Sequence, residues 1–381
     1  MIRSLSTGVQ GMKQFQTALD VIGNNLANIN TVGYKSGRVE FEDALAQTMR
    51  APTPDTASVS GVSGLQVGNG MNIAAIKNSY TQGAINQTGV RSDLAVTGEG
   101  FFLVKDAATG ETFATRAGDF REDNAGYLVT NNGLRVQGVA DMINAPTVIG
   151  DIQVDRGSYT TNRTVGSINT ATDGLTIASH GYLTGNQVNF TTSGTLPTST
   201  PSIYSATTYF VRAIDANTIS LHTTASGAAA DTDRIDFTGT GTGTHTLTPG
   251  ASVSSWSVGA DGKVNMLLTD GAQYVRGQIL MQTFNNPQAL LRAGQNLYSN
   301  LTSAGPFTGA GYSSSTAVLA SAKPPGSGGL GRVQSGSLEL SNVDMAKEFA
   351  TMITTQRAFQ ANARIITTSD EMLQEMMTLK R

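Results

Sequence analysis

The chain has 381 residues, a formal net charge of −3 and a pI near 5.7, and only 14 % of its residues are charged. The length allows two or three domains, and the near-neutral charge gives no reason to expect nucleic acid or an anionic membrane as a partner. The sequence contains no cysteine, which excludes disulfides, thiolate nucleophiles and cysteine-based metal sites.

The beginning of the chain does not resemble a secretory signal peptide, because Arg3 and Lys13 are interspersed with polar residues and no apolar core follows. A run of about eighteen apolar residues, as a membrane-spanning helix requires, does not occur in the sequence either. If the protein leaves the cytoplasm, we expect it to use a route other than the general signal peptide.

The first thirty residues have an apolar residue at every third or fourth position, a pattern that predicts an amphipathic helix. At about 1.5 Å per residue this helix would be roughly 40 Å long, and Gly33 is expected to end it. One alternative is a surface helix packed on a globular core. The apolar positions are Ile2, Leu5, Val9, Met12, Phe15, Leu19, Ile22, Leu26 and Ile29.

Residues 341–381 predict a second, longer helix, with Ser341 as its N-cap and Asp344 three residues later. Glu348 near its start and Lys380 with Arg381 at its end would complement the helix dipole. The predicted apolar seam comprises Met345, Phe349, Met352, Phe359, Ala363, Ile366, Leu373 and Met377, with Gln356 and Asp370 at two further heptad positions, and Ile353, Ile365, Met372 and Met376 lie beside it.

A helix of roughly 38 residues, about 57 Å long, needs a partner along its length, since each large apolar side chain contributes about 1.5–3 kcal/mol when buried. We therefore expect the two terminal helices to form a coiled-coil-like pair. The apolar face of the second helix is wider than one partner can cover, which predicts self-association. The candidate self-assembly residues are Leu5, Val9, Met12, Phe15, Leu19, Ile22, Leu26, Ile29, Met345, Phe349, Met352, Ile353, Phe359, Ile366, Leu373 and Met377.

Between the helices, short apolar runs broken by turn residues predict antiparallel strands. Residues 93–104 indicate two strands about a turn at Gly98–Gly100, and residues 254–284 indicate further strands with turns at Asp261–Gly262 and Asp270–Gly271. Each stretch is short for an independent sheet. We expect the two to pair in one discontinuous β-rich domain, residues 86–156 and 251–310.

Residues 157–250 are rich in threonine and poor in charge, and the runs QVNF, YFVRAI and NTISLH predict a small antiparallel β-domain inserted into the first. All three histidines, His180, His222 and His245, lie in this segment. They could be metal ligands, but no acidic cluster accompanies them. Histidines scattered over strands and surface are the other interpretation, and we assign no metal site.

Proline, glycine and serine are concentrated in residues 51–70 and 321–331, which suggests linkers between the helices and the β-domains. The expected plan is a terminal helical polymerisation domain (1–35 and 341–381) and an extended connecting region (36–85 and 311–340) around the two β-domains. The fold class is therefore α+β, with mainly antiparallel β-domains inserted between paired terminal helices.

No catalytic or cofactor motif is recognisable. The Gly-x-Gly segments TGEGFF and VGNGMN lack the third glycine and the following helix of a dinucleotide-binding loop, and there is no P-loop, G-x-S-x-G or H-E-x-x-H. The adjacent acids Glu42–Asp43 and Glu122–Asp123 are typical of solvated surface pairs. We predict no catalytic, cofactor-binding or metal-binding residues and no enzyme, although a carboxylate pair formed only by the fold remains an alternative.

Two long motifs at opposite ends of the chain resemble the signatures of the bacterial flagellar rod and hook proteins. They are ALDVIGNNLANINTVGYKSGRVEFEDAL (residues 18–45) and LELSNVDMAKEFATMITTQRAFQANARIITTSDEMLQEMMTLKR (residues 338–381). The segments 83–104 and 277–300 are also similar to that family. The resemblance covers most of the chain apart from about 157–250.

Within this family the inserted domain favours a hook subunit, whereas the opening MIRSL and the segment 41–70 are more similar to the distal rod protein. The resemblance implies export through the flagellar type III apparatus and polymerisation beneath a cap into a tube that encloses the export channel. It also implies partners: other copies of the chain, the distal rod protein, the hook cap and the hook–filament junction proteins. In a hook the tube would be curved and would transmit torque, with an extracellular location.

Overall fold

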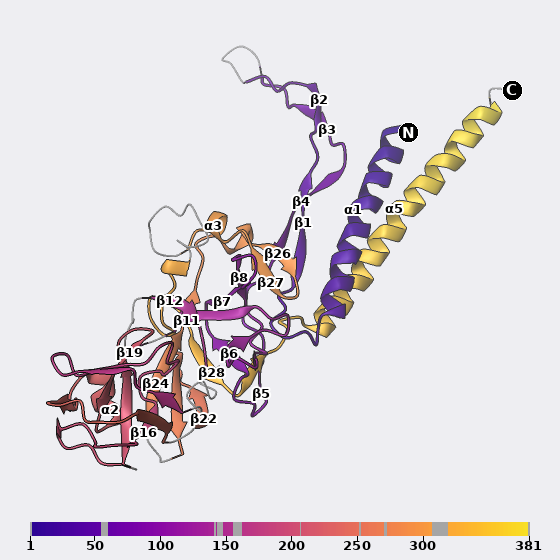
Figure 1. The fold of residues 1–381 in the computed structure, drawn as a ribbon. Helices are drawn as coiled ribbons and strands as arrows, with labels where there is room; N and C mark the ends of the chain where they lie inside the picture. The colour runs from indigo at the N-terminus through magenta and orange to yellow at the C-terminus, as the bar shows by residue number, and fades with distance from the viewer. Residues whose placement is uncertain are drawn as a thin grey trace. The chain divides into compact units, whose positions relative to one another are not determined.

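The computed structural model describes residues 2–54, 60–140, 142, 148–154, 162–205, 207–250, 253–269, 273–306 and 319–379 (Figure 1). The chain forms two compact units. The helical unit consists of residues 1–84 and 340–381, and the β-rich unit consists of residues 85–339. Within the described ranges, no helix combines the length and the apolar character needed to cross a membrane.

The helical unit brings the two ends of the sequence together. Its long helices lie side by side, which confirms the predicted pairing, and a β-ribbon adjoins the N-terminal helix (Figure 1). Its elements are α1 (Ile2–Ala27), β1 (Gly37–Asp43), β2 (Gln47–Arg50), β3 (Leu65–Val67), β4 (Met71–Asn78) and α5 (Met345–Leu379).

Helix α1 ends at Ala27, earlier than the expected stop at Gly33, which instead lies in a turn with φ of +68°. The asparagines after the helix explain the early end. Asn28 donates its side-chain amide to the backbone oxygen of Asn24, and asparagine side chains compete in this way with helical backbone bonds. Ile29 therefore lies in the turns beyond the helix.

Helix α5 is capped by Asp344, so the prediction of Ser341 as the N-cap was wrong. The Asp344 carboxylate accepts hydrogen bonds from the backbone N–H groups of Ala346 and Lys347, at 3.0 and 3.2 Å. The Ser341 hydroxyl instead accepts from the N–H of Val343 before the helix begins. Glu348 lies in the first turn as predicted, whereas Lys380 and Arg381 lie outside the described residues.

The β-ribbon consists of two antiparallel pairs. β1 pairs with β4 from Gly37 opposite Asn78 to Asp43 opposite Met71, and β2 continues the ribbon by pairing with β3. Its inner end packs on α1, where the rings of Phe15 and Phe41 are 5.6 Å apart. The strands β2 and β3 are exposed along their whole length.

The β-rich unit contains a large antiparallel sheet with the order β22-β23-β24-β11-β7-β8-β27-β26. β24 pairs with β11 and β25 with β7, so the two stretches of sequence that flank the insertion share one sheet, as predicted. The predicted turn at Gly262 is present, and the one at Asp270–Gly271 lies outside the described residues. The elements of this part are β5 (Ile85–Gln87), β6 (Leu94–Thr97), β7 (Phe101–Lys105), β8 (Thr112–Thr115), β9 (Arg121–Glu122), β10 (Leu128–Val129), β11 (Arg135–Val139), β12 (Ile149–Asp151), β22 (Val253–Val258), β23 (Lys263–Leu268), β24 (Gln273–Ile279), β25 (Met281–Gln282), η1 (Pro287–Ala289), β26 (Leu291–Gly294), β27 (Leu297–Ser299), α3 (Leu301–Ala304), β28 (Arg332–Ser335) and β29 (Ser337–Glu339).

The inserted segment forms a second antiparallel sheet with the order β13-β21-β16-β18-β19-β15-β14. The three predicted runs become β16, β18 and β19, which are neighbours in this sheet. Its elements are β13 (Arg163–Thr164), β14 (Ser167–Asn169), β15 (Gly174–Thr176), β16 (Gln187–Thr192), β17 (Ser199–Thr200), β18 (Thr208–Ala213), β19 (Thr218–His222), α2 (Ala225–Ala230), β20 (Asp236–Phe237) and β21 (His245–Pro249).

Two hydrophobic cores stabilise the β-rich unit. One is built from residues between 94 and 154 and between 256 and 333, and it includes Trp256. The other is built only from residues between 165 and 247. Each of the two sheets thus has a core of its own, which is the usual condition for a separately folding layer.

Residues 321–331, the second predicted linker, are part of the β-rich unit, so the prediction of a linker there was wrong. Lys323 exchanges backbone hydrogen bonds with Met281, and Leu330 belongs to the core that contains Trp256. The chain then forms β28 on β6 and β29 on β5. At the end of β29, Glu339 forms a buried ion pair with Arg116, with 3.3 Å between Oε2 and Nη1.

Candidate self-assembly surface

The terminal helices form an antiparallel pair with one register along its length. Gly8 lies next to Ile366, Gly11 next to Asn362, and Asn25 next to Glu348, so the numbers of facing residues add up to 373 or 374. Ile2 consequently lies opposite about residue 371. No described residue of α1 faces the last eight residues of α5. At 1.5 Å per residue these eight residues are about 12 Å long. Figure 1 shows that the free end of α5 extends past α1.

The contact face of α5 follows a heptad pattern with steps of four and three residues. In this face, large apolar side chains alternate with polar side chains, which are uncommon in the contact between two helices. The buried hydroxyls of Thr355 and Ser369 donate back to the backbone oxygens of Thr351 and Ile365, so their burial leaves no donor unpaired. The face consists of Glu348, Met352, Thr355, Phe359, Asn362, Ile366 and Ser369, and Leu373 continues its spacing beyond the residue opposite Ile2.

Small residues of α1 make room for this polar row. A Cβ atom on Gly8 would lie 3.3 Å from Cγ1 of Ile366, and one on Gly11 would lie 2.7 Å from Nδ2 of Asn362. The helices therefore approach closely where these two glycines face α5. Further along, Ala18, Ile22 and Asn25 complete the buried face of α1.

The structure divides the predicted assembly residues into two groups. One group is at least partly buried: Leu5, Met12, Phe15, Leu19, Ile22 and Leu26 on α1, Ile29 just beyond it, and Met352, Phe359, Ile366 and Leu373 on α5. The others are exposed: Val9 (49 %), Met345 (49 %), Phe349 (45 %), Ile353 (50 %) and Met377 (76 %).

The seam predicted for α5 was therefore wrong in part. Met345, Phe349 and Met377 do not lie in the contact with α1, and Glu348, Thr355, Asn362 and Ser369 occupy it instead. Selecting the most apolar helical stripe misses these positions, because their burial depends on the small residues of the partner helix. The sequence signal that could have located them is Gly8, Gly11 and Ala18 at helical spacing.

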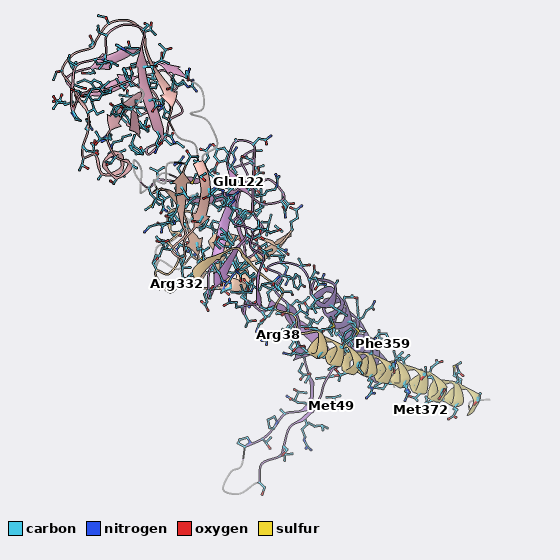
Figure 2. The ribbon with its side chains drawn as sticks, turned by 90° about the horizontal axis from the view of Figure 1, so that it is seen from below. Arg38, Met49, Glu122, Arg332, Phe359 and Met372 are labelled. Carbon is cyan, nitrogen blue, oxygen red and sulfur yellow. The ribbon has the colours of Figure 1, made fainter. Side chains whose placement is uncertain are left out.

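Two groups of large apolar side chains on α5 remain 43–76 % exposed. The base patch consists of Met345, Phe349 and Ile353 in the first turns. The tip patch consists of Ile365, Met372, Met376 and Met377 towards the free end, and Figure 2 shows Met372 there, beyond Phe359. Exposed apolar clusters of this kind commonly mark interaction surfaces.

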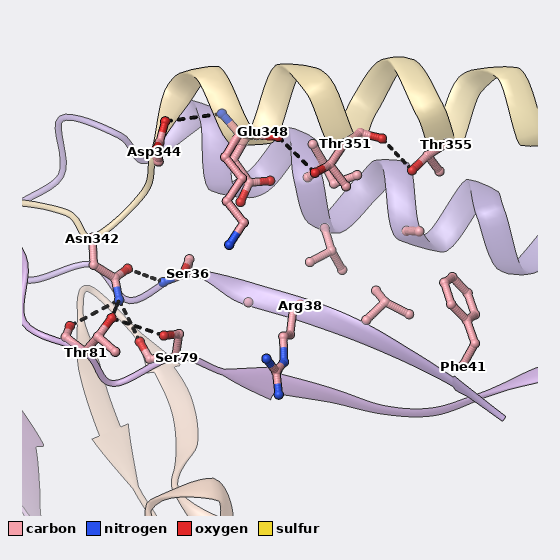
Figure 3. A pocket seen from close by; sticks show the side chains of 16 residues that line it. Ser36, Arg38, Phe41, Ser79, Thr81, Asn342, Asp344, Glu348, Thr351 and Thr355 are labelled. Atoms are coloured by element: carbon pink, nitrogen blue, oxygen red, sulfur yellow. Dashed lines mark hydrogen bonds between the residues drawn. The ribbon is translucent and has the colours of Figure 1, made fainter.

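A partly buried polar junction holds the start of the pair, and Figure 3 shows part of it. Asn342 accepts a hydrogen bond from the N–H of Ser36 at 2.8 Å and donates to the backbone oxygens of Ser79 and Thr81. The fully buried Lys35 donates its Nζ proton to the same Thr81 oxygen at 2.7 Å. The side chain of Asn342 thus joins the segment before α5 to both ends of the β1–β4 hairpin.

Asn25 extends this junction into α1. Its amide nitrogen donates to the backbone oxygen of Gly37 at 2.7 Å, and its amide oxygen accepts from the N–H of Gly37 at 2.9 Å. The Tyr34 hydroxyl donates to the same amide oxygen. Sequence reasoning did not single out Asn25, Lys35 or Asn342, because isolated polar residues produce no periodic signal.

A groove of about 530 Å³ opens beside the pair, lined by residues of α1, β1 and α5 together with Ser79 and Thr81 (Figure 3). Its walls are mixed: Val21, Ile22 and Phe41 contribute apolar surface, whereas Arg38 and Lys347 contribute positive charge. The groove contains no arrangement of nucleophile, base and oxyanion donors, and we assign it no chemistry.

The histidines and the Gly-x-Gly segments have structural partners. The His222 ring bonds to the backbone oxygen of Thr232, and the His180 ring bonds to that of Asp215. Among the described residues there is no group of three or more histidine or acidic side chains that could hold a metal ion. Gly98 has φ of +106°, and an added Cβ would lie 3.1 Å from Cα of Gly331, so this glycine serves a close backbone approach.

Comparisons with known proteins place the chain in a family. Family models match residues 5–35 (flagella basal body rod protein), 95–266 (flagellar hook protein FlgE/F/G D1 domain) and 334–379 (flagellar basal body rod FlgEFG protein C-terminal). The chain is 32 % identical to the flagellar basal-body rod protein FlgG of Bacillus subtilis, over the whole of both chains. It is 30 % identical to the flagellar hook protein FlgE of Borreliella burgdorferi, again over the whole of both chains.

The flagellar hook protein FlgE of Escherichia coli is 28 % identical over 99 % of this chain and 100 % of the relative. The crystal structure of Helicobacter pylori flagellar hook protein FlgE2 aligns with a TM-score of 0.36 and 12 % identity, covering 67 % of this chain and 100 % of that chain. The chain belongs to the family of flagellar hook and basal-body rod proteins. It is a structural component of the bacterial flagellum, and proteins of this family assemble with their own copies in the flagellar axis.

Proposed function

We propose that the chain is the subunit of the flagellar hook, which polymerises into a curved tube. The tube encloses the export channel and transmits torque from the rod to the filament. Relatives named flagellar hook protein FlgE align with 99–100 % of the chain, which supports this proposal. The inserted sheet with its separate core also favours a hook subunit over the shorter distal rod protein.

The observation that carries the proposal is the apolar surface left on α5. The base and tip patches together place seven large apolar side chains at 43–76 % exposure on one helix. Full burial of such a side chain contributes about 1.5–3 kcal/mol relative to full exposure, and a solitary subunit forgoes the share that belongs to the exposed part of each. Other copies of the chain are the partners that a homopolymer supplies, so the sixteen candidate residues act in assembly either within the pair or between copies.

We propose the following domain plan for a subunit that forms part of the wall of a tube. Residues 1–35 and 341–381 form the polymerisation domain, 86–156 and 251–310 form the β-rich domain, and 157–250 form an outer inserted domain. Residues 36–85 and 311–340 connect them, and the described part of the second connection up to Glu339 packs with the β-rich unit. The subunit is exported unfolded by the flagellar type III apparatus. Its partners are the distal rod protein, the hook cap and the hook–filament junction proteins, and the hook lies outside the cell.

The proposal assigns the chain no enzymatic activity, cofactor or metal. Its support is the structural character of the family and the absence of a catalytic motif in the sequence. The carboxylate pairs considered from the sequence do not contradict this. The Glu122 carboxylate, for example, accepts a hydrogen bond from Nε1 of Trp256 at 2.6 Å.

The distal rod is the second candidate, because the Bacillus subtilis relative with 32 % identity over the whole chain is named a rod protein. Electron microscopy of tubes polymerised from the purified full chain separates the candidates. Curved, supercoiled tubes are expected for a hook subunit and straight, stiff tubes for a rod subunit. A chain that forms no tubes at concentrations at which related hook subunits polymerise would contradict both.

A further inference from the structure

Two residues of each exposed patch lie on opposite flanks of the contact between α5 and α1. Phe349 and Ile353 each follow a residue in the heptad spacing of the α5 contact face by one position, whereas Ile365 and Met372 each precede one. Because successive residues of an α-helix are about 100° apart, residues after and before the contact face point to opposite sides of it. The base patch lies at the start of α5, whereas Met372, Met376 and Met377 lie near its other end and Ile365 lies between them.

The tip patch continues a contact that already exists. Leu373 and Met376 follow the heptad steps of the α5 contact face past the residue opposite Ile2. Their face of the helix is thus built for packing, but no described residue of α1 lies opposite it. Met372, Met376 and Met377 are long, flexible side chains that adapt to an irregular apolar partner.

We propose that the tip patch of one copy packs on the base patch of the next copy, in a head-to-tail contact. This inference rests on the proposed function, because it names the partner surfaces within the polymer. A two-fold contact of base with base, or tip with tip, would cover one patch and leave the other exposed on a closed dimer. A tip-to-base contact covers both patches with one kind of interface and leaves a free patch at each end, so it extends without limit.

The chemistry of the two patches fits this pairing. The base patch offers the flat ring of Phe349 beside a β-branched Ile353, and the tip patch offers three methionines that can pack around them. The two patches therefore differ in shape, as the two halves of a heterologous contact do. Self-contact of either patch would pair like with like.

The absence of native cysteine permits a direct test by cross-linking. Full-length Ile353→Cys and Met376→Cys are polymerised separately and as an equimolar mixture, and each sample is treated with a short bismaleimide. Ile214→Cys, an exposed apolar position in the inserted segment, replaces Ile353→Cys in a matched control mixture. The readout is the fraction of covalent dimer on a denaturing gel, with tube formation verified by electron microscopy.

The proposal predicts covalent dimer in the mixture at a level at least about tenfold above either single variant and above the control mixture. Dimer formed by Ile353→Cys alone or by Met376→Cys alone would overturn it, since that would indicate contact between like patches. Intact tubes with no dimer in the mixture would overturn it as well, while leaving the proposed function in place. Failure of the unsubstituted chain to form any tubes would instead contradict the proposed function, and this pairing with it.

Discussion

The side-chain amide of Asn25, near the end of α1, lies 3.3 Å from Oε1 of Glu348 in the first turn of α5, although 323 positions separate the two residues. The same amide also holds both backbone groups of Gly37 at the start of β1. One buried side chain thus sets the register of the helical pair and the position at which β1 of the β-ribbon begins beside α1. Single buried polar residues are known to specify register in this way.

We predict that Asn25→Ala weakens assembly. The substitution leaves the N–H and C=O of Gly37 without their partner, and each buried unsatisfied group costs about 1–3 kcal/mol. The expected result is a rise of at least about tenfold in the concentration required for tube formation, measured by sedimentation. Asn28→Ala is the control, because the side-chain hydrogen bonds of Asn28 described in the structure join it to nearby Asn24 and Thr31. An equal effect of both substitutions would contradict the role of Asn25.

A second prediction concerns the close approach at Gly11. In Gly11→Ala the new Cβ would lie 2.7 Å from Nδ2 of Asn362, so the helices or the amide must move and the concentration required for tube formation should rise. Asn362→Ala removes the atoms in the way, and the double variant should assemble more readily than Gly11→Ala alone. Gly23→Ala is the control, because an added Cβ there meets nothing within 4 Å. The absence of any rescue would contradict the register described for the pair.

The buried ion pair of Arg116 and Glu339 gives a prediction for the β-rich unit. Their side chains are 3 % and 0 % exposed, and burial lowers the pKa of Arg116 while the Glu339 charge opposes that shift. Glu339→Ala leaves a buried charge unpaired, so it should lower the free energy of unfolding by about 3–5 kcal/mol. Urea unfolding followed by the fluorescence of Trp256 measures this, since Trp256 is in a core of the same unit.

The double variant Arg116→Met, Glu339→Leu should lose less stability than Glu339→Ala, because it leaves no charge unpaired. Lys263→Ala serves as the control. It breaks an ion pair with Asp261 that is 41 % and 48 % exposed, and it should cost at most about 1 kcal/mol. A loss for Glu339→Ala as small as that of the control would contradict the assignment.

Asp119 and Asp106 should respond to pH in opposite directions. Burial raises the pKa of Asp119, and the neighbouring Asp93 carboxylate adds to the effect. The protonated carboxyl of Asp119 therefore contributes to the stability of the fold. This contribution is fully present below the unfolded-state pKa of 3.8 and is lost as pH rises through the higher folded-state pKa. Asp119→Asn should therefore increase stability towards urea at pH 7, and the gain should disappear near about pH 3.5.

Hydrogen bonds from the backbone N–H of Ala108 and from Thr109 lower the pKa of Asp106. Its stabilising contribution is present above the unfolded-state pKa of 3.8 and is lost as pH falls through the lower folded-state value. Asp106→Asn should thus decrease stability at pH 7 and have little effect at low pH. Urea midpoints of both variants at the two pH values test the pair, and effects of the same sign at pH 7 would contradict it.

Local patterns were sufficient for much of the fold. The helical periodicity identified both terminal helices, and alternation with turn glycines identified strands such as β16, β18 and β19. The family resemblance, carried by motifs at both ends, agreed with the comparisons. These features depend on residues close together in sequence, which is why the sequence alone contains them.

Long-range contacts accounted for what the sequence did not reveal. The burial of Thr355 and Ser369 depends on small residues of α1 that are more than 300 positions away in the sequence. The cap at Asp344 depends on the path of the chain just before α5, which the hydrogen bonds of Asn342 fix. The side chain of Asn342 forms hydrogen bonds with backbone groups of Ser36, Ser79 and Thr81, and no spacing in the sequence indicates that these residues come together. The apolar stripe alone therefore could not separate the residues of the pair from those left for other copies.

The most direct test of the account compares α5 in a verified monomer and in the polymer by hydrogen exchange of residues 345–379. We predict that these amides, and those of α1, exchange rapidly in dilute monomer and become protected on assembly, because the base and tip patches of α5 stay exposed until copies meet and the helical pair alone is only marginally stable. Far-UV circular dichroism should show the same gain of helix. Full protection of both helices in the monomer, unchanged in tubes, would contradict the claim that assembly completes their fold.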